Sequence, residues 1–142
     1  MKKAVLVALS AFALSCFAPG ASADNVEVGG RIIAGGGTQL SNGLFFPGTA
    51  LPRADGGFDG LDPVQIKQGT DVEFVNLDEA SVSNAHEMIS QKRRKGRPLF
   101  ASEQLTRPGE TALVLTSNLK PGVYAFYCSV HSGMWGRIEI VR

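Results

Sequence analysis

Three side chains close together near the C-terminus have the chemistry of metal ligands. The stretch 127–134 reads Tyr-Cys-Ser-Val-His-Ser-Gly-Met, so a thiol, an imidazole and a thioether follow one another at intervals of three residues. Strongly alternating segments lie on both sides of this stretch, which predicts one tight loop between two strands. Donors of these types on one tight loop can enclose a single ion.

A further donor has to come from elsewhere in the chain. The sequence contains only two histidines, His86 and His131, so a site with two imidazoles uses both. Two His and one Cys in a trigonal arrangement, with a weak axial Met, form the ligand set of blue-copper centres. The expected copper ligands are therefore His86, Cys128, His131 and Met134. Met88 lies two residues from His86 and is the alternative thioether.

The first 23 residues have the organisation of a cleavable secretory signal. A cationic start at Lys2 and Lys3 precedes an apolar run over 4–18, and Ala21-Ser22-Ala23 gives the small-x-small cleavage pattern. The apolar run is too short to span a bilayer stably. We expect cleavage after Ala23, export to the periplasm, and a single mature domain over 24–142 without a transmembrane segment.

Export makes the cysteine count informative. Cys16 leaves with the signal, so the mature chain keeps Cys128 alone. Exported proteins usually pair their cysteines, and metal ligation is one explanation for a single thiol; a buried inert thiol is the other. Removal of Lys2 and Lys3 leaves 12 basic residues against 13 acidic ones, a net charge of −1. No global charge therefore attracts the domain to nucleic acid or acidic lipid.

Short alternating apolar segments separated by Gly and Pro turns run through the mature chain. The predicted strands lie near 26–28, 32–33, 64–66, 71–76, 113–115, 123–128 and 137–141. This pattern predicts an all-β Greek-key β-sandwich. Two stretches do not fit simple hairpins. Residues 35–62 read as irregular surface loop with an edge segment at 44–46, and residues 78–106 form a long connection that carries His86.

The chain from about Val64 to Arg142 resembles the small bacterial cupredoxins, which are type 1 blue-copper proteins. The resemblance rests on the Cys-x2-His-x2-Met loop, which is like that of amicyanin and shorter than that of plastocyanin, and on segments 68–78 and 121–128. It implies a sandwich with one copper ion per chain at one end, cycling between Cu(I) and Cu(II). The implied function is one-electron transport between transient protein redox partners. We expect a monomer without enzymatic activity.

Two positions depart from the pattern of this family. Many cupredoxins have an Asn directly after the first His, bonded to the residue after the Cys. Here Glu87 takes that position, and Asn84 is a possible substitute as the partner of Ser129. Ser132-Gly133 replaces the Pro that follows the second His in amicyanin-like loops, which predicts a more flexible ligand loop.

Several alternatives stay open. A copper-carrying or copper-buffering protein would use the same ligands and exchange the metal readily, and a module of a larger oxidase would hold a metal of fixed valence. Zinc is less favoured because structural zinc sites are richer in Cys. A thiol enzyme is less favoured because no oxyanion-hole motif accompanies Cys128. The basic run 92–97 could dock an acidic redox partner or be a solvated loop. Trp135 could join a docking patch or pack against the first strand.

Overall fold

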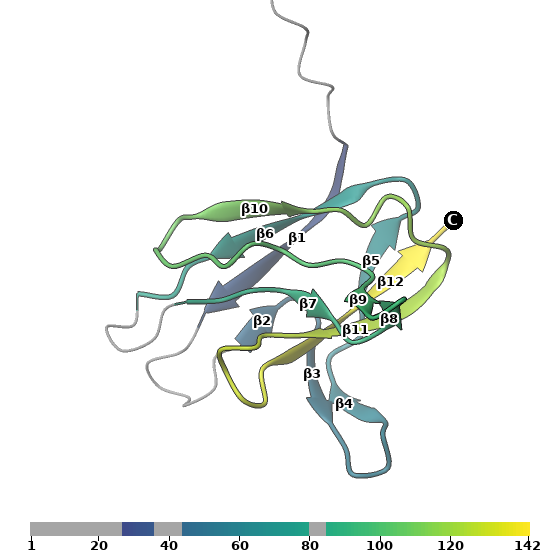
Figure 1. Ribbon diagram of the computed structural model, residues 1–142, viewed down its shortest axis with the longest axis horizontal. Helices are drawn as coiled ribbons and strands as arrows, with labels where there is room; N and C mark the ends of the chain where they lie inside the picture. The colour runs from purple at the N-terminus through teal and green to yellow at the C-terminus, as the bar shows by residue number, and fades with distance from the viewer. Residues whose placement is uncertain (1–26, 36–43, 80–84) are drawn as a thin grey trace, which may run out of the picture.

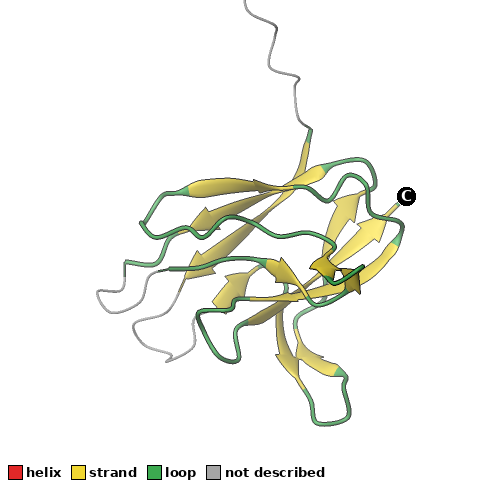
Figure 2. Cartoon of the chain, viewed as in Figure 1, coloured by secondary structure: helices red, strands yellow, loops and turns green. Residues whose placement is uncertain are grey.

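The computed structural model describes residues 27–35, 44–79 and 85–142, and this part of the chain consists of strands and loops (Figure 2). The predicted signal segment lies outside these residues. No helix in them is long and apolar enough to cross a membrane. The strands are β1 (Val28–Gly35), β2 (Leu44–Phe46), β3 (Thr49–Pro52), β4 (Phe58–Gly60), β5 (Val64–Lys67), β6 (Asp71–Asn76), β7 (Ile89–Ser90), β8 (Arg93–Arg94), β9 (Arg97–Pro98), β10 (Thr111–Val114), β11 (Gly122–Tyr127) and β12 (Trp135–Val141).

Two sheets form the sandwich (Figure 1). The first has the order β10-β6-β1-β2, in which β1 and β6 run parallel. The second has the order β4-β3-β12-β11-β7, and β5 also pairs with β12 in parallel. Strands that are distant in the sequence, such as β1 and β6, are thus neighbours in space. The predicted all-β sandwich is confirmed.

Three phenylalanine rings join the two sheets in the core. Phe45 of β2 lies 4.8 Å from Phe126 of β11 and 6.0 Å from Phe74 of β6, measured between ring centroids. All three side chains are fully buried, and burial of each contributes about 1.5–3 kcal/mol. Gly136 of β12 allows this packing, because a Cβ at that position would collide with the Phe126 ring.

The N-terminal strand is longer than the sequence predicts. Gly29-Gly30 reads as a turn, yet β1 continues through both glycines, with a register shift between Val28 and Gly30. A Cβ at Gly29 would collide with the Thr70 side chain, and one at Gly30 would lie 2.5 Å from Ile66 Cδ1. The two glycines therefore permit a close approach between β1 and its neighbours instead of ending the strand.

Residues 44–62, the described part of the Gly/Pro-rich stretch after β1, contain more strand structure than predicted. The edge segment at 44–46 is present as β2, but β3 and β4 add an antiparallel hairpin that joins the second sheet through β12. The Arg53 amide donates to the Gly57 carbonyl, and the Gly57 amide donates to the Asp55 carboxylate. These local bonds close the hairpin turn. They need no alternation of apolar residues, so the sequence pattern did not reveal this hairpin.

The connection 78–106 runs along the edge of the second sheet. Its strand β7 pairs with β11, and β8 and β9 form a short hairpin of their own. An isolated bridge joins His86 to Leu105. This bridge holds the backbone of His86 in place.

Candidate metal centre

The loop Cys128–Met134 connects β11 to β12 at the end of their ladder. Tyr127 pairs with Trp135 as the last step of that ladder. The Cys128 amide then donates to the Met134 carbonyl at 3.1 Å, and the Met134 amide donates to the His131 carbonyl at 3.3 Å. These two bonds fold the seven-residue loop on itself and bring Cys128, His131 and Met134 to one end of the sandwich.

His86 approaches the same end from the connection that precedes β7. Its amide donates to the Leu105 carbonyl at 2.9 Å, and the Leu105 amide donates back to the His86 carbonyl at 2.8 Å. The Asn76 side-chain amide also donates to the Leu105 carbonyl, at 3.2 Å. The end of β6 and the segment around Leu105 therefore hold His86 against the ligand loop.

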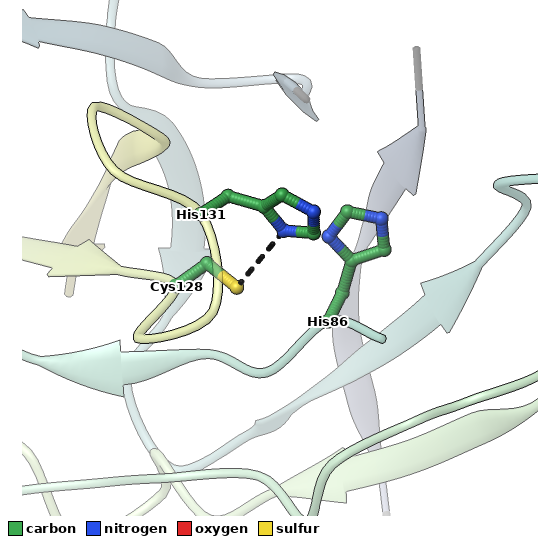
Figure 3. Close-up of side chains that lie close together, drawn as sticks. All are labelled: His86, Cys128 and His131. Carbon is green, nitrogen blue, oxygen red and sulfur yellow. Dashed lines mark hydrogen bonds between the residues drawn. The ribbon is translucent and has the colours of Figure 1, made fainter. Parts of the chain in front are cut away.

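The donor atoms of His86, Cys128 and His131 converge. One donor atom from each residue lies within 4.8 Å of the other two, and Cys128 Sγ lies 3.6 Å from His131 Nδ1 (Figure 3). Two donors bound to one ion at about 2.0 and 2.3 Å, and roughly 120° apart, would be about 3.7 Å from each other. The Cys128–His131 spacing therefore fits two ligands of a trigonal site.

The two imidazole rings are stacked, with centroids 4.5 Å apart and planes inclined by 30°. His86 Nε2 lies 2.9 Å from the Asp78 carboxylate. His86 Nδ1 is buried and has no hydrogen-bond partner within residues 27–35, 44–79 and 85–142, and in Figure 3 it is the ring nitrogen directed at His131. A buried polar atom without a partner is costly. A metal ion beside Cys128 and His131 would satisfy this nitrogen.

The side chains of the site are shielded from solvent. His86 is 0%, Met134 1%, Cys128 4% and His131 8% exposed. Burial lowers the pKa of His86 below its ordinary value, the Asp78 hydrogen bond partly opposes this, and the neighbouring His131 adds to the lowering. Neutral imidazole is the form that binds a metal, so the surroundings of His86 favour ligation.

Both candidate thioethers lie in the core. Met134 belongs to the ligand loop, and its backbone is bonded to those of Cys128 and His131. In the β7–β11 pair, Ile89 faces Tyr127, so one further step of the same register would place Met88 opposite Cys128. Met134 is therefore part of the same closed loop as Cys128 and His131, and Met88 stays the alternative axial donor.

Glu87 and Ser129 connect the two segments that carry the ligands. The Ser129 hydroxyl donates to the Glu87 carboxylate. Glu87 therefore makes the link that many cupredoxins make with Asn at this position. Asn84, the predicted substitute, lies outside the described residues. Trp135 contacts Phe58 of β4 and Tyr127 of β11, with ring-centroid distances of 5.8 and 5.1 Å. Its membership of a docking patch stays a prediction.

Sequence reasoning missed one residue of the centre, Asp78. It lies two residues after β6, its amide is bonded to the Asn76 side chain, and its carboxylate faces His86. An acidic residue in a polar segment after a strand is unremarkable in a sequence. The one available signal was that Asp78 closes the stretch 68–78 on which the family resemblance rests.

The sandwich and its His₂Cys cluster define a copper protein of the cupredoxin class. Residues 60–141 match the copper binding proteins of the plastocyanin/azurin family. This match covers more than half of the chain, and the protein belongs to that family. Comparison with curated protein sequences gives no match.

Solved structures share the fold. A purple cupredoxin from Nitrosopumilus maritimus is 23% identical, with a TM-score of 0.52; the similarity covers 79% of this chain and 99% of that one. A copper-containing nitrite reductase from Thermus scotoductus is also 23% identical, with a TM-score of 0.51; there 89% of this chain matches 25% of the enzyme chain. At this level of identity the likeness shows the fold alone, and the chain spans only a quarter of the reductase.

Proposed function

We propose that this protein is a type 1 copper electron carrier whose ligands are His86, Cys128, His131 and Met134. The observation that carries the proposal is the buried His86 Nδ1, which has no hydrogen-bond partner among the described residues and lies beside a thiol and a second imidazole. A copper ion bound there would supply one-electron chemistry by alternating between Cu(I) and Cu(II).

Each side chain would have a separate role. Cys128 would give the thiolate, and His86 and His131 the imidazole nitrogens, while Met134 would be the weak axial donor that tunes the potential. Asp78 would accept a hydrogen bond from the Nε2–H group of His86. This bond keeps the ring proton on Nε2 and leaves the Nδ1 lone pair free for the metal. Such carboxylate–histidine pairs orient the ligand ring and raise its basicity.

The burial of the site supports transport of electrons rather than catalysis. Catalytic metal sites keep an open position for water or substrate. Here each of the four proposed ligands is at most 8% exposed. A closed site of this kind suits electron exchange with another protein, without binding of a substrate to the metal. Export to the periplasm, with cleavage after Ala23, is part of the same proposal and rests on the sequence pattern of residues 1–23.

Visible absorption after addition of Cu(II) tests the function. The copper form should show an intense charge-transfer band, because a Cys thiolate bound to Cu(II) produces one, and a reductant should abolish it. Cys128→Ser should lack the band while its far-ultraviolet circular dichroism matches that of the unmodified protein. A band that persists in this variant would exclude Cys128 as the thiolate ligand.

A copper-buffering protein is the second candidate, suggested by Ser132-Gly133 in place of the Pro of amicyanin-like loops. The same sample separates the two functions. A carrier retains its copper through repeated oxidation and reduction at an electrode in the presence of a Cu(I) chelator. A buffering protein loses the metal to the chelator on the first reduction.

A further inference from the structure

The basic run forms an ordered hairpin. We use the name basic hairpin for residues 92–97, whose cations are Lys92, Arg93, Arg94, Lys95 and Arg97. In the β8–β9 pair, Arg94 faces Arg97 and Arg93 faces Pro98. The two turn residues both have positive φ, 52° at Lys95 and 80° at Gly96, which is typical of a type I′ hairpin turn. The cations are therefore displayed on a fixed backbone.

Side-chain contacts attach the basic hairpin to β11, the strand that leads into the ligand loop. Lys92 Nζ donates to the Val123 carbonyl at 3.2 Å and lies 4.8 Å from the centre of the Tyr124 ring. Arg93 donates to the Tyr127 hydroxyl at 3.4 Å, and Tyr127 directly precedes Cys128. Figure 1 shows β8 and β9 lying beside β11. The hairpin thus has a defined position relative to the proposed copper ligand.

The positive charge of this hairpin is not neutralised locally. Among the ion pairs of the described residues, none includes a cation of the basic hairpin, and all five of these residues are exposed. Outside residues 92–97 the mature chain has seven basic residues against 13 acidic ones. The hairpin therefore carries five positive charges, while the rest of the mature chain has a net charge of −6.

A groove of about 550 Å³ lies against the hairpin. Its charged lining comes from Arg94, Lys95 and Arg97, and its other lining residues include Asn118, Leu99 and Leu119. The cations therefore flank a recess that also offers an amide and apolar surface. A combination of charge and apolar contact is typical of a protein-binding surface rather than of a purely solvated loop.

We infer that the basic hairpin and this groove form the docking surface for an acidic patch on a protein redox partner. This inference rests on the proposed electron-carrier function, which requires such a partner. Complementary charge steers two proteins into encounter and raises the association rate. The excess of acidic residues elsewhere would repel an extended anionic surface such as a membrane or nucleic acid, so a compact acidic patch is the favoured occupant.

Poly-L-glutamate serves as the probe, in a titration of the Cu(I) protein followed by amide chemical shifts. Shifts should be confined to residues 92–99 and 118–119 and should disappear at high salt, because screening removes the attraction. The charge reversal Arg94→Glu/Arg97→Glu should weaken binding by about tenfold. The matched control Lys67→Glu/Arg142→Glu alters two exposed cations elsewhere by the same net charge and should weaken binding by less than about twofold.

Equal weakening in both double variants would overturn the inference, because the protein's net charge would then decide binding. Tighter binding of anionic phosphatidylglycerol vesicles than of poly-L-glutamate at the same salt would also overturn it. Voltammetry of the unmodified protein separates the two proposals. A reversible copper couple without poly-L-glutamate binding contradicts the docking surface alone, and absence of any couple contradicts the electron-carrier function.

Discussion

The Asp78 carboxylate lies 2.9 Å from His86 Nε2, and the two side chains are 3% and 0% exposed. This contact joins the end of β6 to the connection before β7, and it leaves the second nitrogen of His86 directed at Cys128 and His131. A buried carboxylate beside a proposed copper ligand has electrostatic consequences, because the two oxidation states of copper differ by one unit of charge.

Asp78→Asn should raise the reduction potential of the bound copper. A negative carboxylate stabilises Cu(II) more than Cu(I), and the amide retains the shape and hydrogen-bonding capacity without the charge. We expect a rise on the order of 60 mV, which corresponds to about tenfold in the equilibrium constant for one electron. Voltammetry measures this shift. Asp62→Asn, which removes an exposed carboxylate, is the control and should leave the potential nearly unchanged.

Met134→Gln should retain copper and lower the potential, since a harder axial donor favours Cu(II). Met88→Gln is the matched comparison, because Met88 is also fully buried and close to His86 in the chain. Voltammetry and visible spectra of the two variants identify the thioether ligand. A shift in the Met88 variant alone would transfer the axial role to Met88.

His86→Gly should open a coordination position that added imidazole can fill. The mature chain offers only two imidazoles for a His₂Cys site, and the buried Nδ1 of His86 has no hydrogen-bond partner in the part of the chain that the structure describes. The visible spectrum should change in the variant and recover in part with imidazole. If the variant keeps the native spectrum and potential without imidazole, His86 is not a ligand.

Gly136→Ala should destabilise the fold by about 1–3 kcal/mol, the usual cost of overpacking a core. The new methyl group would meet the Phe126 ring, one of the rings that join the two sheets. Urea denaturation measures the loss. Gly35→Ala is the control and should cost much less, because a Cβ at Gly35 in β1 would meet no atom of the described residues within 4 Å.

The sequence predicted the features that depend on short stretches of chain. The alternation in 123–128 and 137–141 corresponds to β11 and β12, and the loop between them brings Cys128, His131 and Met134 together because they are close in the chain. The count of histidines assigned His86 to the same site. That assignment of ligands stays a prediction, and the structure adds that His86 lies beside Cys128 and His131.

Only the tertiary structure decided the features that depend on contacts between distant segments. Gly29-Gly30 has the composition of a turn, yet it lies within a strand because Thr70 and Ile66 pack against it. Asp78 and His86 meet because the backbone of His86 is hydrogen-bonded to that of Leu105, which is distant in the sequence. The basic hairpin is positioned by contacts with β11 that its own sequence does not reveal. Composition and periodicity report which surface a segment buries, but not which distant segment covers it, since that choice is made by long-range pairing and packing.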